Sequence, residues 1–293
     1  MTPFNKILFP VDFSNSSSAL VPDVITLAQK FAASVIVMHA FDLVPQYNLA
    51  PQIDAPFGPE PGDVPYTPLL RDLREIRQNR LDEFVRDHLA GIETRAIVED
   101  GDPARAIDWV AAKENIDLVM MSTKGMGTFR RMLMGSLTAK VLHDLECPVY
   151  TSPHEPGEKP VSPDNFKTIL CAVRMEPESE AALKIAGSMA RAFGSRVCLV
   201  HVHTPNEPKG HEPTAAGVRE AFEQALGQVD DGSVATQVRI LDSAVPEGIR
   251  QAAVEEAADL VVVGRGHARG SVSHIWSHLY TLIRESPCPV LSV

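Results

Sequence analysis

Short apolar runs alternate with longer amphipathic stretches along the whole chain. Residues 7–12 and 118–121 contain runs too short for a helix, with the length of strands buried on both faces of a parallel sheet. Helix-compatible segments follow such runs, among them residues 16–33, 69–89 and 104–114. This alternation of strand and helix predicts an α/β fold with a parallel, doubly wound sheet.

The same pattern occurs twice, once in each half of the chain. Ile169 repeats Ile7, and Phe193 repeats Phe31, both at an offset of 162 positions. Residues 260–263 repeat 118–121, and a Cys-Pro-Val run closes each half, at offsets of 142 and 141. We therefore predict two tandem domains, residues 1–152 and 166–293, joined by a proline-rich linker at 153–165.

The first half carries a longer insertion than the second. Residues 41–68 hold seven prolines among scattered apolar residues, so we expect no regular element there. Because this segment follows a strand, it leaves from the strands' carboxyl edge. A lid over a ligand, a passive surface loop and an arm that contacts a partner all agree with this pattern.

A glycine-rich stretch follows the central strand of the first half. Ser122 and Gly125 are small residues that allow backbone N–H groups to approach a ligand closely, and Lys124 places a positive charge beside them. Gly135 and Ser136 then precede a helical pattern, so we expect Ser136 at the N-cap. Free N–H groups at a helix start favour anions. On composition alone, the stretch is equally typical of a simple turn.

The spacing of this stretch resembles a family signature. Ser122-x2-Gly125-x9-Gly135-Ser136 is similar to the Gly-x2-Gly-x9-Gly-Ser/Thr signature of the universal stress protein family, with serine in the first glycine position. The resemblance extends over nearly the whole chain, through Asp12 after the first strand, Met38-His39, Gly101-Asp102-Pro103 and the two Cys-Pro-Val runs. No Walker A motif or full dinucleotide fingerprint occurs.

The resemblance implies a fold, a ligand and a set of binding residues. The fold is a five-stranded parallel sheet with helices on both faces in each domain, of the adenine nucleotide alpha hydrolase-like kind. The ligand is ATP, with or without Mg²⁺; Asp12 would hold the adenosine and the glycine-rich stretch the phosphates. The expected binding residues are Pro10, Val11, Asp12, Ala40, Met121, Ser122, Lys124, Gly125, Gly135, Ser136 and Leu137. Taken alone, Asp12 is more typical of a turn or capping residue before the next helix, and the other motif residues favour the binding role.

The second half departs from the signature. Asp12 corresponds to Arg174, and two of the glycines correspond to His267 and Ser277. Side chains at former glycines obstruct close backbone approach, so we expect no ATP site of this kind there. Gly264 is retained. The basic residues Arg265, His267, Arg269 and His278 could hold another anion or simply face solvent.

Composition narrows the function classes. The net charge is −11 over 293 residues, which argues against a nucleic-acid partner or an anionic membrane surface. No apolar run reaches the length of a membrane span, and the start lacks a secretory leader pattern, so we expect a cytoplasmic protein. The four cysteines form no Cys-x-x-Cys pair, and we interpret them as buried thiols.

The resemblance implies an ATP-binding regulatory protein of stress adaptation, and we expect it to be no enzyme or to hydrolyse ATP only slowly. An ATP-hydrolysing or phosphotransfer enzyme and a nucleotide-free scaffold are the alternatives. For such an enzyme, His39 and His143 are the candidate catalytic histidines. His39 suits a strand end equally well, and His143 a helix surface. The final strands, residues 148–151 and 289–293, are expected to pair within the chain as a pseudo-dimer, and they also allow a homodimer.

Overall fold

The computed structural model describes residues 3–41, 66–123, 136–152, 166–174, 179–203, 214–226, 234–265 and 273–293, and in these ranges all side chains but those of 66–70 and 273–277. The strands are β1 (Lys6–Pro10), β2 (Ser34–Phe41), β3 (Thr94–Asp100), β4 (Leu118–Ser122), β5 (Val149–Ser152), β6 (Thr168–Ala172), β7 (Arg196–His203), β8 (Thr236–Asp242), β9 (Leu260–Val263) and β10 (Val290–Ser292). The helices are α1 (Asn15–Phe31), α3 (Tyr66–His88), α4 (Pro103–Glu114), α5 (Ser136–Asp144), α6 (Ser179–Phe193), α7 (Ala215–Leu226), α8 (Val245–Glu255) and α9 (Ser273–Glu285).

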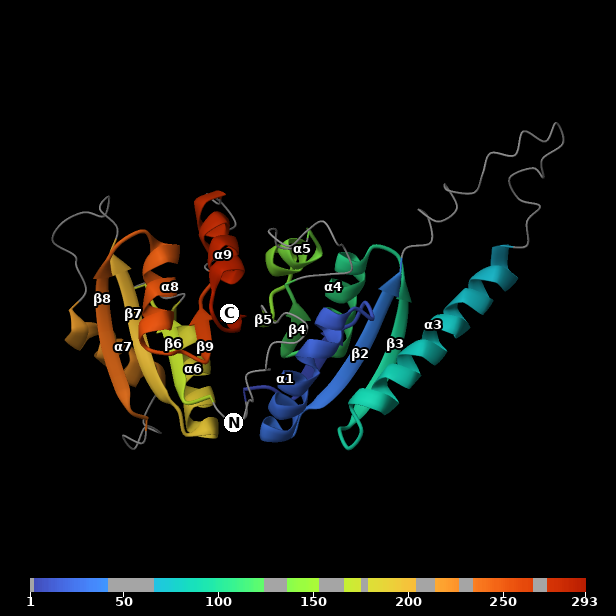
Figure 1. Ribbon diagram of the computed structural model, residues 1–293, viewed down its shortest axis with the longest axis horizontal. Coiled ribbons are helices and arrows are strands. Elements are labelled where there is room, and N and C mark those ends of the chain that lie inside the picture. Colours follow the sequence, from blue (N-terminus) through green and yellow to red (C-terminus); the bar gives the residue numbers. More distant parts are fainter. Residues whose placement is uncertain are drawn as a thin grey trace.

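All ten of these strands form one sheet, in the order β3-β2-β1-β4-β5-β10-β9-β6-β7-β8. Each half contributes five strands that run parallel, which confirms the predicted doubly wound α/β class. Figure 1 shows the two halves side by side, with the carboxyl end of the chain at their junction. In each half the strand order reverses beside the first strand, between β1 and β4 or between β6 and β9.

Helices cover both faces of the sheet and bury two apolar layers. One layer packs α1, α3, α6 and α7 against side chains such as Phe9 and Cys171. The other packs α4, α5, α8 and α9 against side chains such as Leu8 and Leu170. Adjacent strand residues thus enter opposite layers, which explains why the strands are apolar at nearly every position.

The two halves meet through the antiparallel pairing of β5 with β10. Tyr150 lies opposite Leu291, and these two residues are also counterparts in the repeat. Thr151 Oγ1 donates to the Val290 carbonyl and Ser292 Oγ donates to the Val149 carbonyl, each at 3.2 Å. The internal pairing expected of the final strands is therefore present, and it has an approximate two-fold symmetry.

A buried polar pair lies beside this junction in the first half only. The Tyr150 hydroxyl donates to Asp23 Oδ2 at 2.8 Å, and the exposed fractions of the two residues are 0% and 1%. Burial, together with the Asp23 carboxylate, raises the pKa of Tyr150, so its hydroxyl stays protonated and can donate. The counterparts in the second half are the apolar residues Leu291 and Ile185.

The start of α4 agrees with its local sequence signals. Gly101 has φ +111°, the Asp102 side chain accepts from Arg105 N–H at 3.1 Å, and Pro103 begins α4, which confirms the predicted turn, N-cap and first helical position.

The prediction that residues 41–68 hold no regular element is wrong at both ends. Phe41 still belongs to β2, and α3 already begins at Tyr66. Pro68 fits there because the first turn of a helix leaves its N–H groups unpaired. Residues 42–65 lie outside the described ranges.

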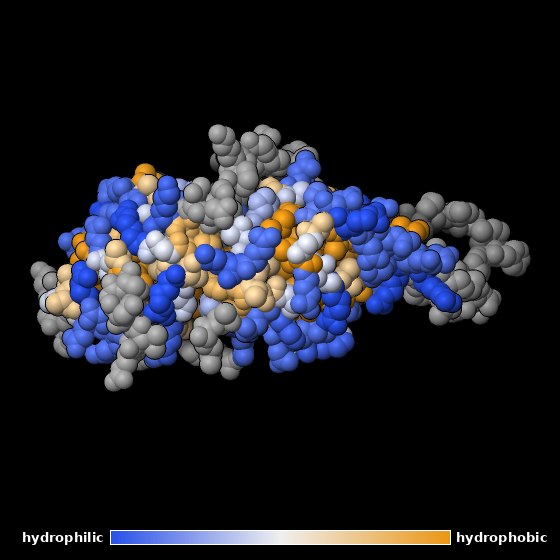
Figure 2. Space-filling model, turned by 90° about the horizontal axis from the view of Figure 1, so that it is seen from below, coloured by the Kyte–Doolittle hydropathy of each residue, from blue (hydrophilic) through white to orange (hydrophobic). Residues whose placement is uncertain are grey.

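The surface seen from below in Figure 2 is mostly hydrophilic, with apolar residues gathered along its middle. That view looks toward the amino ends of outer strands such as β2 and β7, whose arrows run upward in Figure 1. The carboxyl ends, where ligands of such sheets bind, lie on the other side.

Removing one member of the Tyr150–Asp23 pair should destabilise the protein more than replacing both with the apolar pair of the second half. We expect Tyr150→Phe to lower the free energy of unfolding by about 2 kcal/mol, because a buried carboxylate loses its donor. The double variant Asp23→Ile/Tyr150→Leu should lose clearly less than the sum of Asp23→Ile and Tyr150→Leu. Urea unfolding of wild type, Asp23→Ile, Tyr150→Leu and the double variant measures this difference, and additive losses would contradict it.

Candidate functional site

The candidate site lies where the strand order of the first half reverses. Asp12 follows β1 and Ser122 ends β4, and these strands are parallel neighbours, so both residues lie at the same edge of the sheet. Ala40 lies near the end of β2 beside β1, and Val11 N–H donates to the Met38 carbonyl at 2.8 Å. A crevice at this position is where open α/β sheets bind their ligands.

The Asp12 carboxylate is oriented by two donors. Its Oδ1 accepts from Ser17 Oγ at 2.6 Å and from Ser14 N–H at 3.0 Å. Ser14 is the N-cap of α1, and its own hydroxyl oxygen accepts from Ser17 N–H at 3.2 Å. Asp12 is thus a turn residue, as the alternative interpretation expected. The same bonds hold its carboxylate rigidly at the sheet edge, which a binding role would also need.

Phe13 has an unusual backbone beside this carboxylate. Its φ is +59°, a left-handed conformation that costs a bulky residue on the order of 1–3 kcal/mol. The Arg80 guanidinium lies 4.3 Å from the Phe13 ring centroid, and the His39 ring lies 4.5 Å away. These contacts with α3 and β2 support the strained turn and thereby the position of Asp12.

His39 fixes the end of β1. Its Nδ1 donates to the Val11 carbonyl at 2.8 Å, and burial lowers the pKa of His39, so the ring is neutral at pH 7. His201 makes the same bond to Val173 at 3.0 Å in the second half. Because the pair recurs in both halves, we assign His39 to strand geometry. His143 is exposed on α5 and lies 2.8 Å from Asp144 Oδ1, as suits a residue of the helix surface.

Helix α5 approaches the same edge and is tied to its neighbours. Thr138 Oγ1 donates to the Ser122 carbonyl at 3.3 Å, which joins the first turn of α5 to the end of β4. Lys140 Nζ contacts Asp102 Oδ1 at 3.1 Å and joins α5 to α4. The helix begins at Ser136 itself, so the prediction that placed Ser136 at the N-cap is one position late. Its N–H remains among those that a helix start leaves unpaired.

The structure therefore brings several predicted binding residues to one edge. Those within the described ranges are Pro10, Val11, Asp12, Ala40, Met121, Ser122, Ser136 and Leu137. Val11 and Met121 have buried side chains, so they could serve a ligand only through their backbone. Lys124, Gly125 and Gly135 lie outside the described residues. Sequence reasoning missed Ser17 and Thr138, although a serine five positions after Asp12 could have indicated the first.

The second half keeps the frame of this site and changes its chemistry. Arg174 replaces Asp12, while Ser179, the counterpart of Ser17, still accepts from the residue 174 N–H at 3.0 Å. The suggestion that Arg265 holds an anion is wrong. Its guanidinium is buried and donates to carbonyl oxygens of the first half, so it faces away from solvent. His278 is exposed; His267 and Arg269 lie outside the described residues.

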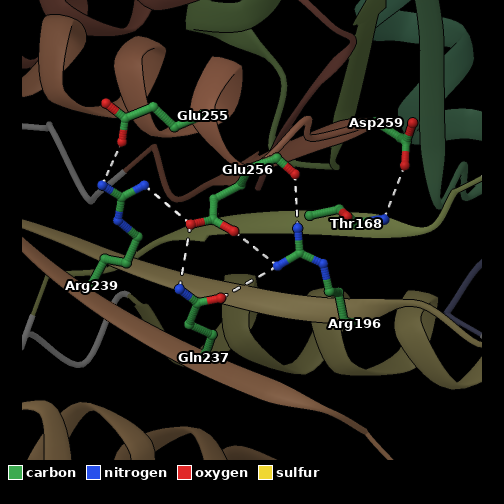
Figure 3. Close-up of polar contacts among 7 residues, drawn as sticks. All are labelled: Thr168, Arg196, Gln237, Arg239, Glu255, Glu256 and Asp259. Atoms are coloured by element: carbon green, nitrogen blue, oxygen red, sulfur yellow. Dashed lines mark hydrogen bonds and ion pairs between the residues drawn. The ribbon is translucent and has the colours of Figure 1, made fainter.

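Figure 3 shows a second polar network, which belongs to the opposite edge of the sheet. The Glu256 carboxylate bridges Arg196 at 2.9 Å and Arg239 at 3.1 Å, and Arg196 also donates to the Glu256 carbonyl at 2.8 Å. Asp259 accepts from the Thr168 N–H at 2.9 Å. Thr168 and Arg196 begin β6 and β7, Arg239 lies in the middle of β8, and Glu256 follows the last residue of α8. They hold structural elements together, away from the candidate site.

The cysteines have the chemistry of buried thiols. Cys171, Cys198 and Cys288 are buried and Cys147 is half-buried. Burial raises the pKa of Cys147 to about 11 and that of Cys171 to about 12, so both are protonated at neutral pH. The described residues contain no group of three or more histidine, cysteine, aspartate or glutamate side chains able to hold a metal ion. Within the same ranges, every helix is too short or too polar to cross a membrane.

Two successive doubly wound α/β domains, each with a topological switch point beside its first strand, define the class of this protein. The model of the universal stress protein family matches residues 3–153 and again residues 165–293, so the chain belongs to that family and contains two of its domains.

Relatives match single halves of the chain. A universal stress protein of Thermus aquaticus, from the QAH/OAS sulfhydrylase 3′ region, is 30% identical over 147 residues, which cover 50% of this chain and 96% of the relative. Universal stress protein MJ0531 of Methanocaldococcus jannaschii is 26% identical over 147 residues, 50% of this chain and 80% of that protein.

Solved structures match the whole tandem. A universal stress protein of Archaeoglobus fulgidus DSM 4304 superposes with a TM-score of 0.72 at 23% identity, covering 98% of this chain and 95% of its own. A protein of unknown function, PA1789 of Pseudomonas aeruginosa PAO1, gives 0.61 at 13% identity, covering 99% and 92%. These likenesses support the tandem fold.

The Asp102 cap should contribute to stability in a pH-dependent way. The Arg105 N–H and Lys140 lower the pKa of Asp102, so its charged form stabilises the fold at neutral pH and this contribution is lost as pH falls through the lowered pKa. We expect Asp102→Ala to cost about 1 kcal/mol at pH 7, and Asp102→Asn less, because an amide oxygen can also cap.

Urea unfolding at pH 7 and at successively lower pH checks this, with the stabilities of wild type and Asp102→Asn converging as the pH falls through the lowered pKa of Asp102. Ala244, the N-cap of α8, has no side-chain bond and offers a reciprocal variant, Ala244→Asp, which should gain stability. Equal stability of wild type and Asp102→Ala at pH 7 would contradict the role of the cap.

Proposed function

We propose that the chain binds one adenine nucleotide, ATP, in its first half, as a regulatory protein of stress adaptation. The observation that carries the proposal is the convergence of Asp12, Ser122 and the start of α5 at one switch point. A carboxylate acceptor lies at the end of β1, while hydroxyl and N–H donors lie at the end of β4 and the start of α5.

The hydrogen-bond acceptor and donors of this arrangement complement the donors and acceptors of a nucleotide. Hydroxyl groups of ribose and the amino group of adenine donate hydrogen bonds, which suits the Asp12 carboxylate. Phosphate oxygens only accept, which suits the hydroxyls of Ser122 and Ser136 and the unpaired N–H groups at the start of α5. The signature spacing Gly125-x9-Gly135-Ser136 supports the same assignment, because glycines permit close backbone approach.

The second half lacks the acceptor and two glycines of this set. Arg174 cannot accept a hydrogen bond, and its positive charge replaces the negative charge of Asp12. We therefore assign one site to each chain. Mg²⁺, where it accompanies ATP, would be held chiefly by the phosphates.

Binding energy of this kind gives moderate affinity. Hydrogen bonds to a charged group contribute about 1.5–3 kcal/mol each, so a few of them give a Kd on the order of micromolar after the cost of association. The site provides binding groups, and we assign it no catalytic residue; any ATP hydrolysis is expected to be slow.

Titration of ATP into the purified protein by calorimetry tests this proposal. We expect about one nucleotide per chain, a loss of about tenfold in affinity for Ser136→Ala, and no measurable binding for Gly135→Asp, whose carboxylate would repel phosphate. Ser277→Asp, at the counterpart of Gly135 in the second half, is the matched control and should bind as wild type does.

Three results would count against the proposal. Absence of binding in wild type would favour a nucleotide-free scaffold. Equal loss in Ser277→Asp would move the site out of the first half. Release of phosphate that is fast and depends on Gly135 would favour an ATP-hydrolysing enzyme.

A further inference from the structure

Arg265 joins the second half to helix α5 of the first. The residue is 6% exposed, and its guanidinium contacts one carbonyl in the last turn of α5 and three carbonyls of the segment that follows the helix. Nη1 donates to Leu142 at 3.1 Å and to Leu145 at 2.7 Å. Nη2 donates to Glu146 at 3.2 Å and to Cys147 at 2.5 Å. One guanidinium therefore contacts four carbonyls of the other half.

The contact with Leu142 matches the electrostatics of a helix end. The last carbonyls of a helix lack intrahelical partners and carry the negative end of its dipole, which favours a cation. The planar fork of arginine can span several acceptors, which the compact ammonium of lysine cannot. The Arg265 N–H donates to the Val293 carbonyl at 2.7 Å, so the backbone that carries the guanidinium is fixed beside β10.

A second bond from the same half reaches the middle of α5. The Tyr280 hydroxyl of α9 donates to the Ala139 carbonyl at 3.1 Å. At its start, α5 is joined through Thr138 to the Ser122 carbonyl of the proposed site. The helix has 9 residues and is about 13 Å long, so a shift at its end also moves its first turn. The second half thus bears on the helix that begins at Ser136.

Among the described residues, the bonds of Arg265 and Tyr280 to carbonyls of α5 and the residues after it have no equivalent running from the first half to α9. The counterpart of Arg265 is Thr123, which donates to the Ser152 carbonyl of its own half at 3.3 Å. The counterpart of Tyr280 is Thr138, whose bond to Ser122 also stays within the first half. At the end of α9, Ser286 Oγ donates to the Cys288 carbonyl at 2.7 Å. Side chains of the half with the changed signature therefore contact the α5 region of the half with the retained signature, while the bonds between β5 and β10 run both ways.

We propose that Arg265, assisted by Tyr280, is a positioning residue that holds α5 in place and so sets the nucleotide affinity of the first half. This inference rests on the proposed function. The second half then has a function of its own, which is to support the phosphate end of the site in the first half.

The test compares Arg265→Lys and Tyr280→Phe with Ser292→Ala. Ser292 also bonds across the junction, but its partner is the Val149 carbonyl of β5 and not a carbonyl of α5. We expect Arg265→Lys to weaken ATP binding about tenfold and Tyr280→Phe about threefold, with Ser292→Ala within twofold of wild type. Urea unfolding of each variant without nucleotide shows whether the loss of affinity follows global stability. A loss of affinity in Ser292→Ala proportional to its loss of stability would overturn the specific role of Arg265.

Hydrogen exchange separates this inference from the proposed function. In protein without nucleotide, amides of residues 140–145 should exchange about tenfold faster in Arg265→Lys than in wild type or Ser292→Ala. Unchanged exchange, or faster exchange with wild-type affinity, would overturn the positioning role. A wild-type protein that binds no ATP would overturn the proposed function, and the exchange result alone would then decide whether Arg265 holds α5.

Discussion

The antiparallel pairing of β5 with β10 is the constraint on which the rest of the structure depends. It closes two exposed sheet edges against each other and merges two five-stranded sheets into one of ten strands. The pairing also fixes which elements meet at the junction. Because β5 follows α5 and β10 follows α9, these two helices come together above the paired strands, and the Tyr280–Ala139 bond forms between them. The geometry of the first half's candidate site therefore depends on a contact with the second.

The two halves share a frame and differ in chemistry at matched positions. In both halves, the carbonyl just after the first strand accepts a hydrogen bond from a histidine ring. The N–H of the next residue then donates to a serine hydroxyl. At the junction, one half has Tyr150 with Asp23 where the other has Leu291 with Ile185. At the switch point, one has Asp12 where the other has Arg174. Fusing two domains in one chain allows such differences, whereas two identical subunits would have to carry the same residue at both positions.

Periodicity and repeats predicted the strands, the helices and the doubly wound class, because each depends on local apolar patterning. The α4 cap was also predictable, since Gly101, Asp102 and Pro103 each favour one backbone position. The orientation of Asp12 through Ser17, the strained Phe13 and the burial of Arg265 depend on tertiary contacts that a local pattern does not encode. Arg265 in particular resembles a solvent-facing basic residue in sequence, and only the pairing of β5 with β10 places carbonyls of the other half around it. The roles of Lys124, Gly125 and Gly135 rest on the signature spacing, since these residues lie outside the described ranges.

The central claim is that one half of this tandem protein holds a nucleotide and the other supports it. Native mass spectrometry of the intact protein with excess ATP tests the claim most directly, because it counts bound nucleotides per chain. The account predicts a single ATP adduct on each chain and none on the Gly135→Asp variant. Two adducts per chain, or one that persists in Gly135→Asp, would contradict it.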